Sequence, residues 1–256
     1  MACNADARGE RSVIRVDKLQ KHYRNLAAVR GLSFEVLPGQ ILGLVGPNGA
    51  GKTTTMRAIA GIIPATGGVI EVAGYDVRKQ PLKAKRALAY VPDDPALFGS
   101  LTVYEHLVLA ARAYDVADYR AGAEGLLARF GLGDKRDTLA QELSRGEWQK
   151  VAICAAYVQG AKAVLFDEPL TGLDPHGIRT MKASIRERAA EGAAFVISSH
   201  LLSLIEDLCT HLLVLHKGQS LFAGTVAEAR ALASREQEVA TLEESFFHIV
   251  RDAVES

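Results

Sequence analysis

The sequence is poor in cysteine, and its cysteines form no pattern. Cys3, Cys154 and Cys209 lie far apart, and no C-x-x-C or cysteine–histidine spacing suited to a metal ion occurs. This argues against a disulfide scaffold and against a structural zinc site. We therefore expect a protein of a reducing compartment such as the cytosol.

The sequence also lacks a long hydrophobic run and an excess of either charge. The best apolar run, residues 151–158, is far shorter than the roughly 20 residues that a membrane-spanning helix needs. Residues 1–12 are polar and charged, unlike a secretory signal. The formal net charge is zero, with 30 basic and 30 acidic residues, so no nucleic-acid partner is expected.

The remaining composition is that of a globular protein. Short apolar runs alternate with helical patterns, which predicts an α/β fold. Apolar residues at every second position predict strands at residues 13–19 and 32–36. Continuous apolar runs predict buried strands at residues 40–45, 163–166 and 194–197, and Lys217-Gly218 predicts a hairpin between residues 212–215 and 220–222.

Two stretches have a helical period instead. Residues 95–159 are rich in alanine and leucine and are expected to form a helical insert. The last thirty residues predict a helical tail. Its packed face is expected to contain Leu242, Phe246, Phe247 and Val250.

Residues 46–53 match the phosphate-binding pattern G-x-x-x-x-G-K-[ST] at every fixed position. Glycines let successive backbone N–H groups converge on phosphate oxygens, and the helix expected from about residue 53 to 60 adds its N-terminal dipole. Lys52 is expected to reach the β and γ phosphates, and the Thr53 hydroxyl to bind Mg²⁺. We predict a nucleotide site formed by Gly46, Pro47, Asn48, Gly49, Ala50, Gly51, Lys52, Thr53 and Thr54.

A second motif follows the apolar run at residues 163–166, which ends in Asp167 and Glu168. A buried strand would deliver Asp167 to the Mg²⁺ and Glu168 to a position beside the γ-phosphate, where it could polarise the attacking water. Taken alone, two acids after a strand are as consistent with surface salt bridges. Together with the phosphate-binding loop, the catalytic interpretation is favoured.

Beyond these motifs, residues 12–225 resemble the ATP-binding subunits of ATP-binding-cassette (ABC) transporters. Residues 169–175, PLTGLDP, continue the second motif as in that family and place Asp174 in the D-loop. His200, after the run Ile-Ser-Ser, corresponds to the switch histidine, and Tyr23 to the aromatic residue that stacks on adenine. A structural histidine and a packing tyrosine are the alternatives.

The resemblance is imperfect in two motifs. Residues 143–147 read LSRGE where the family has LSGGQ. Serine followed three residues later by glutamate is also a helix-capping pattern, so a simple cap is the alternative. Asp93 stands where the family has the Q-loop glutamine, and it either tunes hydrolysis or shapes the loop. The resemblance implies that four signature residues face the ATP of an opposite subunit: Ser144, Arg145, Gly146 and Glu147.

The resemblance implies a P-loop NTPase fold with a RecA-like core of the ABC type, a small antiparallel β portion and a helical subdomain at about residues 93–160. We expect a disordered tail at residues 1–11, the nucleotide-binding domain at 12–225 and a helical tail at 226–256. ATP and Mg²⁺ are the implied ligands, with Glu168 and His200 catalytic. Asp167 and Thr53 are the implied Mg²⁺ ligands.

The resemblance also implies partners and a location. The first partner is an integral membrane permease subunit on a separate chain. The second is another copy of this chain, or a paralogous cassette, with which it forms an ATP-sandwich dimer. The implied location is the cytoplasmic face of the cell membrane. The LS-R-G signature and the Leu-Glu-x-x-Phe pattern at residues 242–246 resemble exporter subunits of the drug, antibiotic or ion type. Leu97 and Phe98 are expected either to contact the permease or to pack into the core.

Two other functions are weighed. A soluble ABC-type ATPase with a non-transport role would need tandem cassettes or a long coiled coil, and the sequence has neither. A regulatory ATP-binding module would normally lose Glu168 or His200, and both are present.

Overall fold

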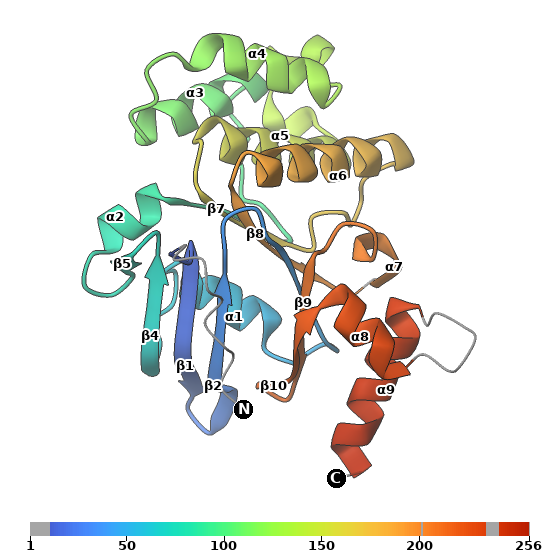
Figure 1. Ribbon diagram of the computed structural model, residues 1–256. Coiled ribbons are helices and arrows are strands. Elements are labelled where there is room, and N and C mark those ends of the chain that lie inside the picture. Colours follow the sequence, from blue (N-terminus) through green and yellow to red (C-terminus); the bar gives the residue numbers. More distant parts are fainter. Residues whose placement is uncertain (1–10, 201, 234–240, 256) are drawn as a thin grey trace.

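The structure is a computed structural model that describes residues 11–200, 202–233 and 241–255. Its strands form two sheets (Figure 1), an antiparallel sheet of four strands in the order β2-β1-β4-β5 and a sheet of six strands in the order β10-β9-β3-β8-β7-β6. The strands are β1 (Ile14–Tyr23), β2 (Leu26–Val36), β3 (Ile41–Val45), β4 (Gly67–Val72), β5 (Tyr75–Asp76), β6 (Leu88–Val91), β7 (Ala163–Asp167), β8 (Ala194–Ser199), β9 (His211–His216) and β10 (Gln219–Thr225).

Some helices pack against the sheets, and others form a separate helical layer. They are α1 (Lys52–Ile59), α2 (Pro81–Arg86), α3 (Val103–Ala113), α4 (Tyr119–Arg129), α5 (Arg145–Val158), α6 (Pro175–Ala190), α7 (Leu202–Ile205), α8 (Val226–Ala233) and α9 (Leu242–Glu255), with 3₁₀ turns η1 (Gly133–Lys135) and η2 (Ala140–Glu142). Helix α1 contacts β2, β4 and β7. Its residues Met56 and Ile59 belong to the core between the two sheets.

The six-stranded sheet is parallel except at one edge, where β10 pairs antiparallel with β9. Every residue of β3, β7 and β8 is buried. Strands covered on both faces are apolar throughout, which explains why these three read as continuous apolar runs. Because parallel strands deliver their carboxyl ends to one edge, the segments that follow β3, β7 and β8 meet there.

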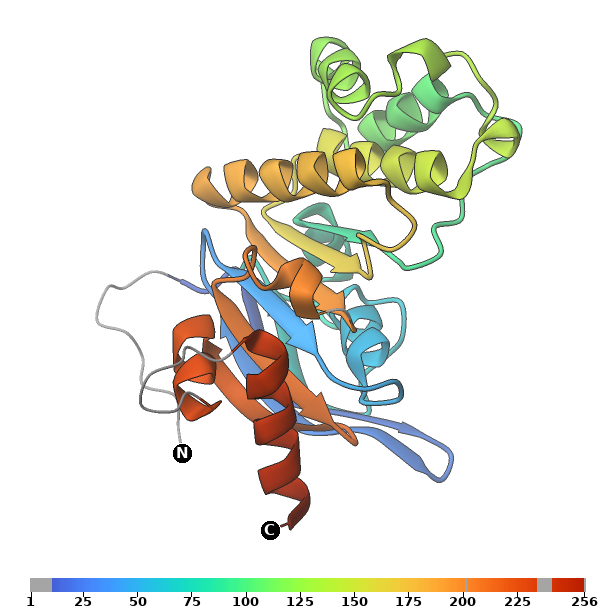
Figure 2. The same ribbon diagram turned by 90° about the vertical axis from the view of Figure 1, so that its right-hand side faces the viewer.

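Helices α3, α4 and α5 form a helical insert that stands above the sheets (Figures 1 and 2). Helix α3 begins after the N-cap Thr102 and α5 after the N-cap Ser144, and a glutamate three residues on completes a capping box in each case. The capping pattern predicted at Ser144 is therefore confirmed. The insert and the six-stranded sheet share one buried apolar cluster, to which Leu107, Ile153 and Phe166 belong.

The expected α/β class is confirmed, and the expected strands coincide, to within one residue at their starts, with parts of β1, β2, β3, β7, β8 and the β9–β10 hairpin. The sequence patterns did not indicate β4, β5, β6 or α2, which are short and lie between residues 67 and 91. Among the described residues, no helix combines the length and the apolar character needed to cross a membrane.

Helix α9 corrects one prediction. Leu242 and Ile249 are buried and Phe246 and Val250 are partly buried, whereas Phe247 is 62% exposed. Positions i, i+4, i+7 and i+8 share a face of a helix, and i+5 points away from it. The prediction that Phe247 lies on the packed face was wrong, and Ile249 takes that place. Residues 1–10, 234–240 and 256 of the two expected tails lie outside the described residues.

Candidate nucleotide site

The loop between β3 and α1 has a backbone that requires glycine. Gly46 has a φ of 153°, and a Cβ there would lie 2.3 Å from the carbonyl oxygen of Leu215 in β9. Gly51 has a φ of 107°, and its Cβ would lie 2.7 Å from the carbonyl oxygen of Ala28. The fixed glycines of the motif therefore let the loop pack against two neighbouring strands.

Replacing Gly46 by alanine should destabilise the protein. Forcing an extra methyl against a rigid carbonyl typically costs about 1–3 kcal/mol, which a thermal melt would show as a lower midpoint. Gly125→Ala is the matched control, because it lies inside α4 with no atom within 4 Å of the added Cβ. Alanine favours helix over glycine, so an equal loss of stability in both variants would contradict the packing argument.

Lys52 is the first residue of α1, and its side chain reaches back to the start of this loop. Its side chain is buried, with the residue 8% exposed, and Nζ donates to the carbonyl oxygen of Gly46 at 2.7 Å and to that of Pro47 at 3.3 Å. Burial lowers the pKa of Lys52, and the negative charges of Glu168 and Asp167 partly offset this. The ammonium group is thus held inside the loop, close to Asp167, which ends β7, and to Glu168, which follows it.

Asp167 is held by side chains from the two strands that flank β7. It is 2% exposed; Ser198 of β8 donates its hydroxyl hydrogen to Oδ1, and Tyr90 of β6 donates to Oδ2 at 3.5 Å. Burial, followed by the charge of Asp167, raises the pKa of Tyr90 to about 12, so the phenol stays a donor. Sequence reasoning missed Ser198 and Tyr90; the available signal was the polar residue near the end of each neighbouring strand.

Glu168 and His200 lie side by side. Oε2 of Glu168 is 2.9 Å from Nδ1 of His200, and the His200 backbone N–H donates to the same oxygen at 3.4 Å. Glu168 has a φ of +52°, an unfavourable value for a residue with a side chain. The Glu168 N–H donates to the hydroxyl of Ser198 at 3.1 Å and to its carbonyl at 3.2 Å, which holds this turn in place.

These groups line a cavity of about 630 Å³. Its wall includes most of the phosphate-binding loop and the two acids at the end of β7. The wall also contains residues that the sequence did not indicate. The lining is Tyr23, Leu26, Ala27, Ala28, Arg30, Asn48, Gly49, Ala50, Gly51, Lys52, Thr53, Thr54, Asp93, Arg145, Asp167, Glu168, Thr171, His200 and Lys217. Tyr23 is partly exposed at the end of β1, with Nζ of Lys21 4.8 Å from its ring centroid.

The donor set suits Mg²⁺ with a triphosphate. This ion takes one or two protein oxygens and completes its octahedron with phosphate oxygens and water. The cavity offers the Asp167 carboxylate and the Thr53 hydroxyl, which are both among its lining residues. The residues present therefore fit the predicted ligands.

The remaining predicted residues lie at the rim or outside the cavity. Glu147 caps α5: its Oε2 accepts from the N–H of Ser144 at 2.9 Å, and these bonds lower its pKa. Asp174 caps α6, and a hydrogen bond from the N–H of Gly177 lowers its pKa. Six predicted residues do not line the cavity of the single chain: Gly46, Pro47, Ser144, Gly146, Glu147 and Asp174.

The fold and the site define a P-loop NTPase. A phosphate-binding loop follows β3, a central strand of a mostly parallel sheet, and two acids stand at the end of β7, which is separated from β3 by β8. The family model described as ABC transporter matches residues 29–171. The ABC-type transporter ATP-binding protein EcsA of Bacillus subtilis is 33% identical over 86% of this chain and 90% of its own length. The chain belongs to the ABC transporter family.

Further relatives agree with this assignment. The lipopolysaccharide export system ATP-binding protein LptB of Haemophilus influenzae is 33% identical over 84% of this chain and 91% of its own length. The Nod factor export ATP-binding protein I of Paraburkholderia xenovorans is 34% identical over 83% and 71%. A solved ATP-binding subunit of an ABC transporter, 32% identical, superposes with a TM-score of 0.88 over 93% of this chain and 100% of its own.

Proposed function

We propose that this chain binds ATP with Mg²⁺ in the 630 Å³ cavity and hydrolyses it to power transport, in the export direction, through a separate membrane subunit. The observation that carries the proposal is the Glu168–His200 pair, 2.9 Å apart, at the edge of a cavity that the phosphate-binding loop also lines. The export direction draws support from relatives named for lipopolysaccharide export and Nod factor export.

Each group in the cavity has a proposed part in the reaction. Lys52 and the loop N–H groups hold the phosphates, and Asp167 with Thr53 holds the Mg²⁺, which supplies positive charge at the β and γ phosphates. Glu168 orients and polarises the attacking water as a general base, and His200 keeps the Glu168 carboxylate in place through Nδ1. Tyr23 stacks on the adenine.

We further propose that two copies, or this chain and a paralogous cassette, enclose ATP between them at the cytoplasmic face of the membrane. The signature residues Ser144, Gly146 and Glu147 lie at the N-terminus of α5 but do not line the cavity of their own chain. A helix N-terminus attracts anions, which supports a role toward the ATP of the opposite subunit. Asp174, at the start of α6, would lie at the same dimer interface.

The loop after β6 is the proposed contact with the membrane subunit. Leu97 is partly buried and packs against the core, whereas Phe98 is 61% exposed. The buried His106 of α3 fixes this arrangement: Nε2 accepts from the Phe98 N–H at 3.0 Å, so Nδ1 carries the hydrogen and donates to the carbonyl of Thr102 at 2.8 Å. Leu97 therefore packs into the core, and the hypothesis that this loop contacts the permease depends on Phe98.

Replacing Phe98 by aspartate should abolish co-purification with the membrane subunit and leave ATP binding by the isolated chain unchanged. An apolar ring in an exposed loop is a suitable anchor for a short helix of a partner. The test is an affinity pull-down from detergent-solubilised membranes of the native host. Phe247→Asp is the matched control, since Phe247 is equally exposed, at 62%, on a distant helix.

Two results would count against the transport proposal. If Phe98→Asp retains the membrane subunit as well as Phe247→Asp does, the docking site lies elsewhere. If the unmodified chain brings down no multi-span membrane protein and fractionates away from membranes, a soluble ABC-type ATPase or a regulatory ATP-binding module becomes the better assignment.

A further inference from the structure

Two neighbouring strands direct hydroxyl groups at the buried carboxylate of Asp167. Strand β7, which ends at Asp167, lies between β8 and β6 in the sheet. Ser198 of β8 stands opposite Asp167 in the register and donates its hydroxyl hydrogen to Oδ1, and the phenol of Tyr90 in β6 donates to Oδ2 at 3.5 Å. Each carboxylate oxygen therefore receives one hydrogen bond from a different strand.

Further partners fix the direction of both hydrogen bonds. The Ser198 hydroxyl accepts the backbone N–H of Glu168 at 3.1 Å, so its own hydrogen remains for Asp167. The Tyr90 hydroxyl has a side-chain hydrogen bond with Arg57 of α1, and a guanidinium group can only donate. An ionised carboxylate can only accept. Both hydroxyl groups are therefore donors to Asp167, and they orient its carboxylate from the two strands that flank β7.

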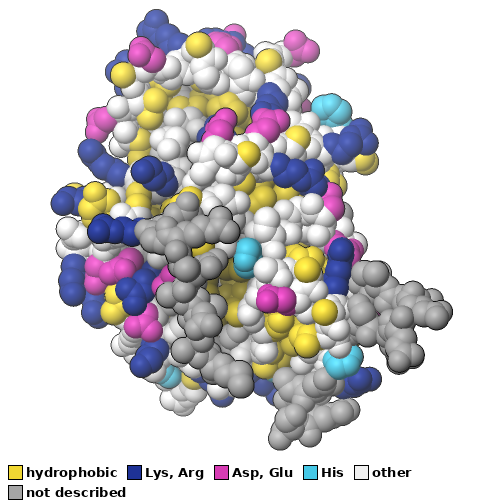
Figure 3. All heavy atoms as spheres, viewed as in Figure 1, with side chains coloured by type: hydrophobic (Ala, Val, Ile, Leu, Met, Phe, Trp, Pro, Cys, Tyr) yellow, Lys and Arg dark blue, Asp and Glu magenta, His cyan; other side chains and the backbone are white. Residues whose placement is uncertain are grey.

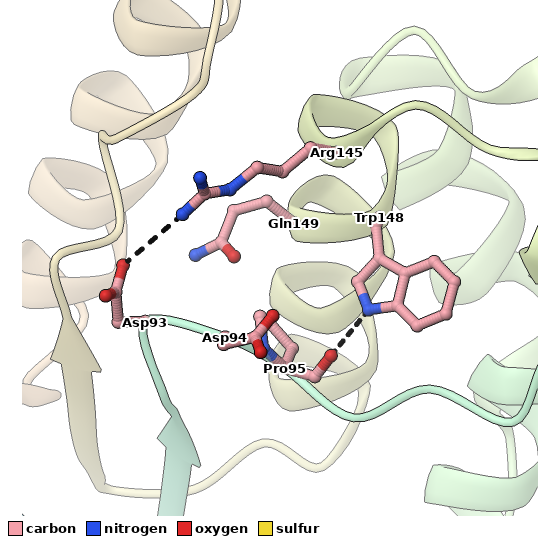
Figure 4. Close-up of a pocket in the computed structure, with 6 residues that line it drawn as sticks. All are labelled: Asp93, Asp94, Pro95, Arg145, Trp148 and Gln149. Carbon is pink, nitrogen blue, oxygen red and sulfur yellow. Dashed lines mark hydrogen bonds and ion pairs between the residues drawn. The ribbon is translucent and has the colours of Figure 1, made fainter.

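The two donors are themselves held in place. Asp167 and Ser198 are 2% and 0% exposed, and they belong to strands that pair with each other. Strand β6 pairs with β7 and leads into the loop shown in Figure 4, where Nε1 of Trp148 in α5 donates to the carbonyl of Pro95 at 2.5 Å. The strand that carries Tyr90 is thus fixed by the sheet along its length and by α5 just beyond its end.

The orientation of a carboxylate matters more for Mg²⁺ than for a larger cation. Mg²⁺ demands near-ideal octahedral geometry, whereas Ca²⁺ accepts irregular coordination. Loss of a group that holds a metal ligand by a hydrogen bond typically costs about 10- to 100-fold in metal affinity. The formal net charge of the chain is zero, and acidic and basic side chains are interspersed over the face shown in Figure 3. The affinity for the ion therefore depends on the local ligands and not on an overall field.

We propose that Tyr90 and Ser198 are positioning residues that orient the Asp167 carboxylate for Mg²⁺ and thereby set the affinity and the selectivity of the nucleotide site for this ion. Ser198 has a second part, because the same hydroxyl holds the N–H of Glu168 and so links the metal ligand to the proposed base. Tyr90 acts on Asp167 alone. This inference deepens the proposed function and rests on it, because it takes Asp167 as a ligand of Mg²⁺.

The test compares nucleotide binding with and without the ion. The dissociation constant of a fluorescent ATP analogue is measured in EDTA and in Mg²⁺, and the ratio of the two gives the contribution of the ion. Tyr90→Phe should lower this ratio by about 10-fold, the lower end of the usual range because its bond is long, and leave binding in EDTA at the wild-type level. With Ca²⁺ in place of Mg²⁺, the ratio should fall less. A merely structural role would weaken binding in EDTA as well.

Ser198→Ala separates the two parts of the serine hydroxyl. It should lower the ratio by about 10- to 100-fold and also slow hydrolysis at saturating Mg²⁺, because the Glu168 turn loses an acceptor. Ser198→Thr, which keeps the hydroxyl, should retain most of both quantities. In Tyr90→Phe, excess Mg²⁺ should restore most of the hydrolysis. Tyr157→Phe is the matched control, because its buried hydroxyl bonds to Ser184 at 3.0 Å outside the cavity. Its ratio should equal that of the wild type.

The positioning role and the proposed function fail in different ways. If Tyr90→Phe and Ser198→Ala keep the wild-type ratio while the chain hydrolyses ATP, the positioning role is wrong and the function stands. If the wild type hydrolyses no ATP, the function is wrong, and the binding ratio still tests the positioning role because it requires no turnover. A wild-type ratio of one, or an equal loss of binding in EDTA and in Mg²⁺ in Tyr90→Phe, would also overturn the positioning role.

Discussion

Glu168→Gln should bind MgATP with an affinity within about twofold of the wild type and lose at least about 100-fold in steady-state hydrolysis. General-base catalysis contributes typically about 10²–10⁴-fold, and an amide is nearly the same size as the carboxylate but cannot take a proton. The turn is held by the Glu168 backbone N–H through Ser198, so the substitution leaves the fold of the site intact. Phosphate release and equilibrium nucleotide titration measure the two quantities.

The same variant should accumulate an ATP-bound dimer, because hydrolysis no longer reopens it. Size-exclusion chromatography with and without MgATP shows this directly. Glu191→Gln is the control, since Glu191 is an exposed residue just after α6 and outside the cavity. Normal turnover by Glu168→Gln would refute its assignment as the base, and loss of turnover in both variants would point to a general loss of folded protein.

The parts of the site that the sequence revealed are those encoded by neighbouring residues. The phosphate-binding loop is a contiguous pattern, and its glycines have a local steric cause at Gly46 and Gly51. Glu168 could be found because the acids follow an apolar strand directly. The α/β class followed for the same reason, since burial on both faces makes β3, β7 and β8 apolar up to the polar residues that end β7 and β8.

The parts that the sequence did not reveal depend on pairing between distant segments. Ser198 contacts Asp167 because β8 pairs with β7 in a register that sets these two residues opposite each other. Tyr90 reaches Asp167 from β6, on the other side of β7. No spacing along the chain encodes these neighbours. The short β4, β5 and β6 were missed because strand propensity depends strongly on the context that pairing supplies.

Arg145 makes a contact that its place in the signature motif does not predict. Its place in the signature predicts a position at the dimer interface, toward the ATP of the opposite subunit, and that prediction stands untested. The chain adds a contact that the motif does not suggest, the intrachain pair with Asp93 at 3.9 Å. Two departures from the family pattern, a cation and an anion, thus lie together, and their charges offset each other.

Lys52→Ala should weaken binding of MgATP by about 10- to 150-fold, which corresponds to the roughly 1.5–3 kcal/mol of a hydrogen bond to a charged group. The ammonium group is already desolvated and held by the carbonyls of Gly46 and Pro47, so little has to be reorganised when phosphate arrives. Its removal leaves the negative charges of Asp167 and Glu168 uncompensated beside the triphosphate. Equilibrium titration with a fluorescent ATP analogue measures the loss.

Lys217→Gln is the control for a general effect of positive charge, because Lys217 lines the same cavity but is exposed. A charge in solvent is screened, so its removal should weaken binding only a few-fold. Lys52→Arg tests geometry: it keeps the charge, but a planar guanidinium does not fit a position that accommodates one compact ammonium between two carbonyls. Binding by Lys52→Arg should therefore lie nearer to that of Lys52→Ala than to that of the wild type. If Lys52→Ala and Lys217→Gln weaken binding equally, ATP is attracted by overall positive charge, and its phosphates do not depend on a specific contact with Lys52.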